Sequence, residues 1–297
     1  MATPPYLFCF GLGYSAGVLA RRLLAAGWRV AGTCRGEAQA AMLRGQGIDA
    51  VAFERGRALP PGAMAGATHL LSSVPPDESG DPVLDLHADE IAALADIRWI
   101  GYLSTTGVYG DWRGAWIDET SPLRPTLERS WRRVYAETAW LDLWRHHGKP
   151  VHVFRLAGIY GPGRSPIDNV RSGKAQRIVK RGQVFSRIHV DDLATVLAAS
   201  MEQPRPGAIY NVCDDDPAAP HVVIAHACGL LGIEPPPEIR YEDAQLSAMA
   251  RSFYADNKRV RNDRLKRELG VALRYPSYKV GLPAILAEER EQGPKGP

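Results

Sequence analysis

Two glycines and an alanine stand at a spacing that suits the binding of a diphosphate. Gly11, Gly13 and Ala16 lie between a short apolar run and a longer amphipathic one. Gly11 permits a tight turn, Gly13 lets the backbone approach a phosphate because it has no Cβ, and Ala16 lets a helix pack closely on a strand. The first N–H groups of that helix would face the phosphates. We therefore predict a dinucleotide-binding loop, rather than a plain glycine turn, formed by Gly11, Gly13, Tyr14, Ser15 and Ala16.

The residue that follows the second predicted strand bears on which dinucleotide is bound. A ribose 2′-hydroxyl is bound by an acidic residue at this position, whereas a 2′-phosphate is bound by arginine. The sequence there reads VAGTCR, with Arg35 and no Asp or Glu. A guanidinium can pair with the phosphate and stack on the adenine ring. The pattern favours NADP over NAD, with a solvated loop arginine as the alternative for Arg35.

The elements that must position these residues alternate along the first half of the chain. Short apolar runs predict strands and longer amphipathic runs predict helices. The predicted strands are Tyr6–Phe10, Arg29–Thr33, Ala50–Phe53, His69–Ser72, Trp99–Leu103 and His152–Leu156, with a further one in GAIYNV. The predicted helices are Ser15–Ala26, Glu37–Arg44, Pro82–Leu94 and Leu127–His147. This alternation predicts an α/β fold, a doubly wound parallel (Rossmann) sheet with ligands at the carboxyl ends of its strands, where we also assign Ser72 to the cofactor.

After about residue 161 the alternation becomes less regular. We predict a Rossmann domain from residues 1–161 and 183–213, and a smaller C-terminal substrate lobe from residues 162–182 and 214–297. The first lobe segment reads as a loop and a basic helix. Its cations either face an anionic substrate or form a solvated surface, and they are Arg164, Arg171, Lys174, Arg177, Lys180 and Arg181, against one Asp168.

Several longer motifs occur in a fixed order. They are YLSTTGVYG at 102–110, FRLAGIYGPG at 154–163, FSRIHVDDLA at 185–194, IYNVCDDDP and RLKRELG. Together with the glycine loop, these motifs resemble the extended short-chain dehydrogenase/reductases, the NAD-dependent epimerase/dehydratase family, over nearly the whole chain. The resemblance implies a Rossmann domain that binds NAD(P) and a C-terminal lobe that closes over the substrate.

In that family a Ser or Thr holds the substrate hydroxyl, a Tyr is the acid/base, and a Lys four residues later binds the nicotinamide ribose and lowers the pKa of the Tyr. Thr105 matches the first of these. The helix reads LERSWRRVYAETAWLDLW, and Glu137 sets a register that places Arg133 at the lysine and Arg129 at the tyrosine. Arginine keeps its proton at any working pH, so Arg129 cannot be the acid/base, while Arg133 could still bind the ribose. The chain resembles an atypical member that lacks the Tyr-x-x-x-Lys pair.

Two tyrosines are candidates for the missing proton donor. Tyr135 lies about 160° around the helix from Arg133, so it is better interpreted as packed beside Trp131. Tyr109 lies in a loop after a sheet strand and is the better candidate, with a structural role as its alternative. We assign as catalytic Thr105, Tyr109 and Arg133.

Other polar residues receive weaker assignments. Asp191 is interpreted as a helix N-cap. His189 and Arg155 shape the loops near the nicotinamide or are structural. Asp118 and Glu119, adjacent on a loop, are expected to be solvated rather than catalytic.

Composition sets the remaining bounds. The 297 residues carry a net charge of +3, with 45% hydrophobic and 23% charged residues, which is typical of a soluble globular protein. No basic stripe interleaved with aromatics indicates nucleic acid, and we expect neither a signal peptide nor a membrane span. The cysteines show no metal-ligand spacing, so we expect no metal and reduced thiols, at Cys9, Cys34, Cys213 and Cys228.

These observations predict a cytoplasmic NADP-binding oxidoreductase or epimerase that acts on a hydroxyl or carbonyl carbon of a sugar or an anionic metabolite. The alternative is a non-catalytic dinucleotide-binding protein, a redox sensor or scaffold. The absent tyrosine favours this alternative, whereas Thr105 and the second lobe favour the enzyme. A small molecule is the expected partner, and a homodimer is a candidate assembly.

Overall fold

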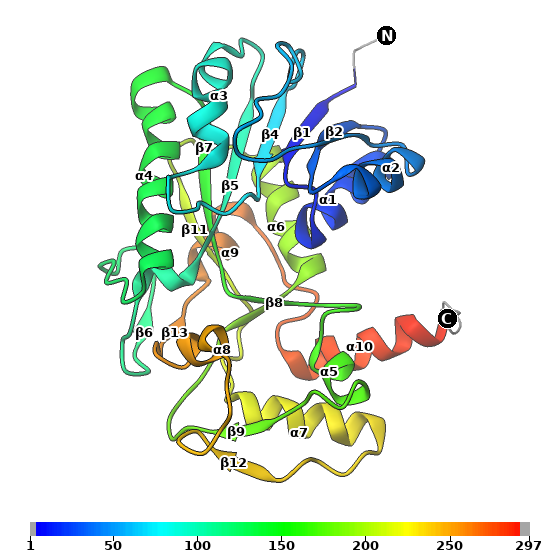
Figure 1. Ribbon diagram of the computed structural model, residues 1–297, viewed down its shortest axis with the longest axis vertical. Coiled ribbons are helices and arrows are strands. Elements are labelled where there is room, and N and C mark those ends of the chain that lie inside the picture. Colours follow the sequence, from blue (N-terminus) through cyan, green and yellow to red (C-terminus); the bar gives the residue numbers. More distant parts are fainter. Residues whose placement is uncertain (1–3, 292–297) are drawn as a thin grey trace.

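The computed structural model describes residues 4–291, and its centre is a seven-stranded parallel sheet (Figure 1). The strand order is β11-β7-β5-β4-β1-β2-β3, so the order reverses between β1 and β4, where ligands of doubly wound sheets bind. The strands are β1 Tyr6–Phe10, β2 Arg29–Cys34, β3 Asp49–Ala52, β4 His69–Ser72, β5 Trp99–Thr105, β7 Val151–Leu156 and β11 Ile209–Val212. The predicted Rossmann sheet is confirmed.

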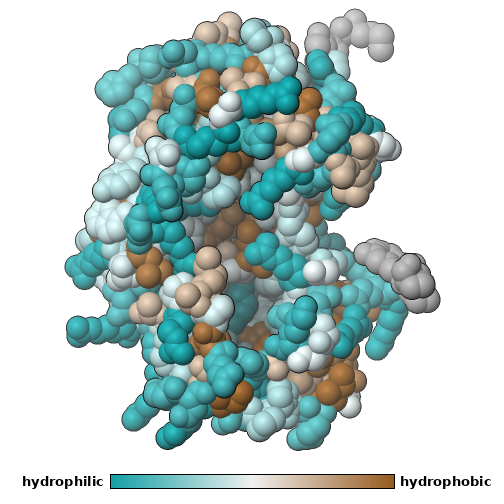
Figure 2. Space-filling model, viewed as in Figure 1, coloured by the Kyte–Doolittle hydropathy of each residue, from teal (hydrophilic) through white to brown (hydrophobic). Residues whose placement is uncertain are grey.

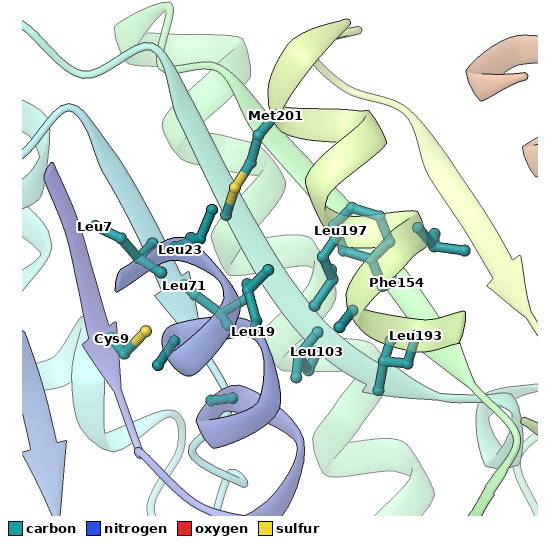
Figure 3. Packing of buried hydrophobic residues seen from close by; sticks show 14 of the residues in the cluster. Leu7, Cys9, Leu19, Leu23, Leu71, Leu103, Phe154, Leu193, Leu197 and Met201 are labelled. Carbon is teal, nitrogen blue, oxygen red and sulfur yellow. The ribbon is translucent and has the colours of Figure 1, made fainter. Parts of the chain in front are cut away.

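Helices cover both faces of this sheet. One face packs against α1 Tyr14–Ala25, α2 Glu37–Gly45 and α6 Val190–Glu202, and the other against α3 Pro82–Ala93 and α4 Glu128–His147. Figure 3 shows the first layer, where strand side chains such as Leu7 and Leu71 meet leucines of α1 and α6. The inner strands β1, β4 and β7 are buried along their whole length, because helices cover both faces of the sheet, whereas the edge strand β3 is mostly exposed.

The predicted elements agree closely with those of the structure. The strands Tyr6–Phe10 and His69–Ser72 are confirmed to the residue, and the other predicted elements shift by one or two residues at their ends. The longest extension is in β5, which continues to Thr105 and is followed by the 3₁₀ helix η1, Thr106–Tyr109. The chemistry-bearing stretch after β5 therefore lies directly at the carboxyl edge of the sheet.

A smaller lobe lies below the carboxyl ends of the strands in Figure 1, and Figure 2 shows the surface hollowed between the two parts. Three two-stranded parallel sheets join distant segments there, and α5, α7 and α10 share a core. The remaining strands are β6 Trp116–Ile117, β8 Gly158–Tyr160, β9 Arg177–Val179, β10 Arg187–His189, β12 Glu238–Arg240 and β13 Arg259–Val260. The remaining helices are α5 Pro166–Arg171, α7 Pro220–Leu231, α8 Ala248–Phe253, α9 Asp263–Leu269 and α10 Tyr278–Glu291.

Two sequence-based expectations are wrong, one in this lobe and one at the start of α6. The basic helix does not form: α5 ends at Arg171, and Arg177 lies in β9, paired with Glu238 at 2.7 Å. Asp191 is not the N-cap of α6, because His189 occupies that position and its Nδ1 accepts the Asp191 N–H at 3.2 Å. Asp191 lies in the first turn of α6, where a carboxylate suits the helix dipole.

The proposed division into two domains remains a prediction, and α9 bears on it. Leu265 and Leu269 of α9 lie in the same core cluster as β11 and α6. The sequence-based boundary had assigned α9 to the smaller lobe. This helix therefore packs on the Rossmann part, although the segments on both sides of it belong to the lobe sequence.

Candidate functional site

The glycine loop turns sharply between β1 and α1. Gly11 has a φ of +85°, which glycine adopts without steric cost. Its N–H donates to Thr33 Oγ1 at 2.9 Å, and the Leu12 N–H donates to Thr33 O at 2.6 Å. These bonds tie the loop to β2, so the start of α1 is held at the carboxyl edge of the sheet.

The start of α1 is suited to a phosphate. Gly13 is its N-cap, with no side-chain cap and no acidic residue in the first turn. A Cβ on Gly13 would meet nothing within 4 Å, whereas a Cβ on Gly11 would lie 2.7 Å from Ser73 Oγ. The fold therefore requires glycine at position 11, while glycine at position 13 leaves open space beside uncapped N–H groups. The loop fits the diphosphate of a nicotinamide dinucleotide.

Arg35 lies where the adenosine end of such a cofactor would reach. β2 ends at Cys34, and Arg35 follows it with an exposed side chain. The nearest acidic residue in sequence, Glu37, forms an ion pair with Arg44. Ser72, at the end of β4, is fully buried and its Oγ has no hydrogen-bond partner among the described residues. An unpaired buried hydroxyl at this edge is consistent with a polar ligand nearby.

Tyr14 connects the glycine loop to the lobe. Its hydroxyl donates to Pro162 O at 3.1 Å, and the Arg164 guanidinium lies over its ring at 5.6 Å. Burial raises the pKa of Tyr14 to about 12. The Tyr14 side chain therefore links the first residue of α1 to the segment that contains Pro162 and Arg164.

The other end of the site is formed by β5 and α4. Thr105, half-buried at the end of β5, accepts the Gly107 N–H at 3.1 Å and keeps its own O–H as a donor. Arg133 donates through one nitrogen, Nη1, to Leu103 O at 2.8 Å and to Tyr102 Oη at 3.1 Å. The structure thus brings Thr105 and Arg133 to the same strand end, and the remaining N–H groups of Arg133 stay available for a ligand.

Arg129, at the position of the family tyrosine, is covered by α8. Its Nη1 donates to Met249 Sδ, and its guanidinium lies 4.7 Å from the centre of the Phe253 ring. Both partners are themselves more than half exposed. A helix from residue 248 onward therefore closes over the first turn of α4, a contact that no sequence pattern indicated.

The expectation that Tyr109 donates a proton to a substrate is wrong. Tyr109 is fully buried, its hydroxyl donates to Asn211 Oδ1 at 2.7 Å, and it accepts from Arg155 Nη1 at 2.9 Å. Burial raises its pKa to about 12. Arg155 also pairs with Glu137 at 2.7 Å, and Ser104 Oγ donates to Glu137 Oε1 at 2.5 Å. Tyr109 is one member of a buried network that fastens α4 to the sheet.

The remaining sequence candidates make contacts within the protein. Tyr135 stacks on Trp131 with ring centres 6.1 Å apart, as expected, but it is 66% exposed rather than packed. Asp118 caps the turn that contains Thr120 and Ser121. Glu119 is not solvated as expected: it is partly buried and accepts the Asn211 N–H at 2.8 Å.

Ser130 lies near the site, although we did not select it from the sequence. Ser130 is 3% exposed, and its Oγ would lie 3.2 Å from a Cβ built on Gly107, so it adjoins η1 and Thr105. It stands three residues before Arg133, so the helical period could have identified it. Among residues 4–291, no group of three His, Cys, Asp or Glu side chains is arranged to hold a metal, and no helix has the length and apolar character of a membrane span.

Comparisons with known proteins agree with this geometry. The family model described as "NAD dependent epimerase/dehydratase family" matches residues 86–213. Protein YeeZ of Escherichia coli K12 is 30% identical over 279 residues, which are 90% of this chain and 94% of that one. A solved structure of a conserved protein of unknown function from Silicibacter pomeroyi DSS is 54% identical, with a TM-score of 0.90 over 96% of this chain and 99% of that one.

A more distant structure shares the fold. UDP-glucuronic acid 4-epimerase from Bacillus cereus, in complex with UDP-glucuronic acid and NAD, has a TM-score of 0.79 at 14% identity, over 97% of this chain and 100% of that one. The glycine loop, the β5 motif with Thr105 and the register of α4 are thus found on a shared architecture. The chain belongs to the NAD-dependent epimerase/dehydratase family.

Proposed function

We propose that the protein binds NADP(H) and acts as an oxidoreductase or epimerase on a hydroxyl or carbonyl carbon of an anionic metabolite. One observation carries the proposal. Arg129 and Arg133 lie one helical turn apart where the family pattern has Tyr and Lys, and Arg133 is anchored beside Thr105 at the end of β5. The uncapped α1 and the exposed Arg35 support NADP at the opposite end.

The chemistry follows from these side chains. The bound nicotinamide would supply or accept a hydride. Thr105 would donate its hydroxyl to the substrate oxygen, and the Arg133 guanidinium would stabilise negative charge that develops there. Neither arginine can relay a proton, so the proton is exchanged with water or with the ligand itself. This arrangement selects ligands that carry a carboxylate or phosphate and disfavours fast turnover of neutral alcohols and ketones.

A non-catalytic redox sensor is the second candidate. It is favoured by the burial of the Tyr109 hydroxyl and by α8, which engages Arg129 through Met249 and Phe253. A sensor needs only cofactor affinity and a segment that moves with occupancy. α8 would then report on the bound dinucleotide.

Pairs of carbonyl compounds that differ in charge distinguish the proposed enzyme from the proposed redox sensor. NADPH oxidation would be followed with 2-oxo acids and with their amides, which differ in charge but retain the carbonyl. An enzyme with the proposed site reduces at least one acid faster than its amide, and Arg133→Ala removes that preference. If NADPH binds but no acid is reduced at any pH, the sensor is correct.

Substituting the family residues Tyr and Lys into α4 tests whether Arg129 and Arg133 occupy the corresponding positions. Arg129→Tyr with Arg133→Lys should increase reduction of neutral carbonyls and lower the affinity for anions. Arg132→Lys is the matched control, because Arg132 pairs with Glu128 on the same helix. Brisk reduction of neutral carbonyls by the wild type, abolished in Tyr135→Phe, would show that the register is wrong.

A further inference from the structure

A cavity of about 460 Å³ lies apart from the residues described above. Three segments line it: the loop after η1 that contains Asp111 and Gly114, residues 180–183 after β9, and residues 255–259, which run from the end of α8 into β13. None of its lining residues belongs to the glycine loop, β5 or α4. A volume of this order holds a small metabolite.

The lining is strongly cationic. Arg113, Lys180, Arg181 and Arg259 line the cavity against one carboxylate, Asp111. Asp111 Oδ1 already accepts the N–H of Arg113 at 3.0 Å and the N–H of Asn257 at 2.8 Å. These bonds fix the carboxylate in the wall, and because four cations face this one carboxylate, the lining is net positive and the cavity attracts an anion.

Gln183 adds a polar group with one atom that lacks a partner among residues 4–291. It lines the cavity and is 2% exposed. Its Nε2 donates to Asp256 O at 2.8 Å, which fixes the orientation of the amide, and no described residue bonds to its Oε1. Buried amide oxygens normally accept a hydrogen bond, so an O–H or N–H group of a ligand would supply the hydrogen bond that Gln183 Oε1 lacks.

The walls are held in place before any ligand arrives. Asn257 donates through Nδ2 to Gly182 O at 2.9 Å and accepts the Val184 N–H at 3.1 Å, which joins two of the three segments. The backbone carbonyl of Asn257 accepts the N–H of Trp112 and the N–H of Gly114, and these bonds join the third segment to the other two. Arg113 has a φ of +50°, and it is the one non-glycine residue with positive φ among residues 4–291. A conformation unfavourable for arginine thus places its side chain at this cavity.

We propose that this cavity binds a small phosphorylated polyol, of the size of a sugar phosphate. The cations would hold the phosphate, and a hydroxyl of the ligand would donate to Gln183 Oε1. No aromatic ring lines the cavity among the described residues, so it offers a nucleobase no stacking surface, which favours a sugar over a nucleotide. The proposal does not depend on the proposed reaction. The segment from α8 to Asn257 borders both this cavity and Arg129.

Calorimetric titration of the full chain with glucose 6-phosphate, inorganic phosphate and glucose tests the proposal. Glucose 6-phosphate should bind saturably and more tightly than phosphate, and glucose should produce no binding heat. Arg181→Ala should weaken both anions by about tenfold, as expected for the loss of one charge-assisted hydrogen bond. Gln183→Leu should weaken glucose 6-phosphate by a similar factor and leave phosphate unchanged.

A second variant separates binding from folding. Arg113→Gly removes one cation and also relieves the positive φ, so the melting temperature should rise while the affinity for glucose 6-phosphate falls about tenfold. Lys174→Ala, an exposed lysine that does not line the cavity, should change neither. The proposal is overturned if glucose 6-phosphate does not bind saturably, if NADPH displaces it, or if its affinity is the same in Arg113→Gly and Arg181→Ala as in the wild type.

Discussion

The two ends of the cofactor site are built in different ways. The phosphate end consists of backbone: Gly11 in a left-handed turn, Gly13 beside open space, and the uncapped start of α1. The end that we propose for the nicotinamide consists of side chains from separate elements, with Thr105 on β5, Arg133 on α4 and Arg129 beneath α8. The first end keeps the family pattern, whereas the second departs from it.

The comparison shows where sequence change is tolerated. A backbone cradle fails when a side chain enters it, so few residue types can stand there. Side chains that project from α4 can change while α4 itself stays in place, because Glu137 and Arg155 fasten it from its buried face. Arginine at positions 129 and 133 is therefore compatible with the fold, and we propose that it changes the chemistry of the site. The predictions below test this contrast, from the largest expected effect to the smallest.

The buried pair beneath α4 should have the largest effect. Arg155→Ala would leave Glu137, which is 3% exposed, without its cation, and we expect the free energy of unfolding to fall by about 3–5 kcal/mol. Urea denaturation measures the loss. The double variant Glu137→Leu/Arg155→Met should be more stable than Arg155→Ala, since no buried charge remains. Equal stability of Arg155→Ala and the wild type would mean that α4 is held by its apolar contacts alone.

At the phosphate end, Gly13→Val should abolish dinucleotide binding. The added side chain enters space that no protein atom occupies within 4 Å, so the fold should survive while the affinity for NADPH falls at least about 100-fold. Calorimetry measures the affinity and circular dichroism the fold. Gly17→Ala, whose added Cβ would meet only the flexible Arg21 side chain, is the matched control. A folded Gly13→Val protein that still binds NADPH would show that the loop is only a turn.

Arg35→Ala should have a smaller and selective effect. Loss of a charge-assisted bond to a 2′-phosphate costs about 1.5–3 kcal/mol, so NADPH should bind roughly ten- to 100-fold more weakly while NADH is little changed. Titration with both cofactors measures the ratio. Arg44→Ala is the control, since Arg44 pairs with Glu37 instead. Equal losses for both cofactors, or tighter binding of NADH by the wild type, would contradict the assignment.

The pH dependence of stability should arise in the core rather than at the nicotinamide end. Burial lowers the pKa of His69, His152 and His189 to about 4. These histidines are neutral in the folded protein but bind protons when it unfolds below about pH 6.5, so stability is full above that pH and is lost as the pH falls toward 4. Each of these histidines changes the free energy of unfolding by at most about 1.4 kcal/mol per pH unit.

His152 offers the sharpest check of this dependence. Its Nε2 accepts the Arg205 N–H at 2.8 Å, and protonation would break that bond. Denaturation between pH 4.5 and 8 should show a shallower slope for His152→Gln than for the wild type. Stability that does not change between pH 6.5 and 4.5 would contradict the assignment.

The sequence by itself determined the features that depend on local pattern. Gly11 and Gly13 followed an apolar run and preceded an amphipathic one, and the structure places β1, the turn and α1 there. The alternation of strands and helices predicted the parallel sheet, because the periods of 2 and 3.6 residues are set by neighbours in the chain. These inferences needed no knowledge of which distant segments meet.

Tertiary structure alone decided the properties that depend on distant segments. The sequence predicts that the Tyr109 hydroxyl could donate a proton to a substrate. In the structure this hydroxyl is hydrogen-bonded to Arg155 of β7 and to Asn211 of β11. Arg129 meets Met249, which is 120 residues away, and the cationic cavity joins three segments between residues 111 and 259. Whether a side chain is buried or paired depends on every residue that lies near it in space. For these residues, most of those neighbours are far away in the sequence. A single sequence carries no pattern that specifies such contacts.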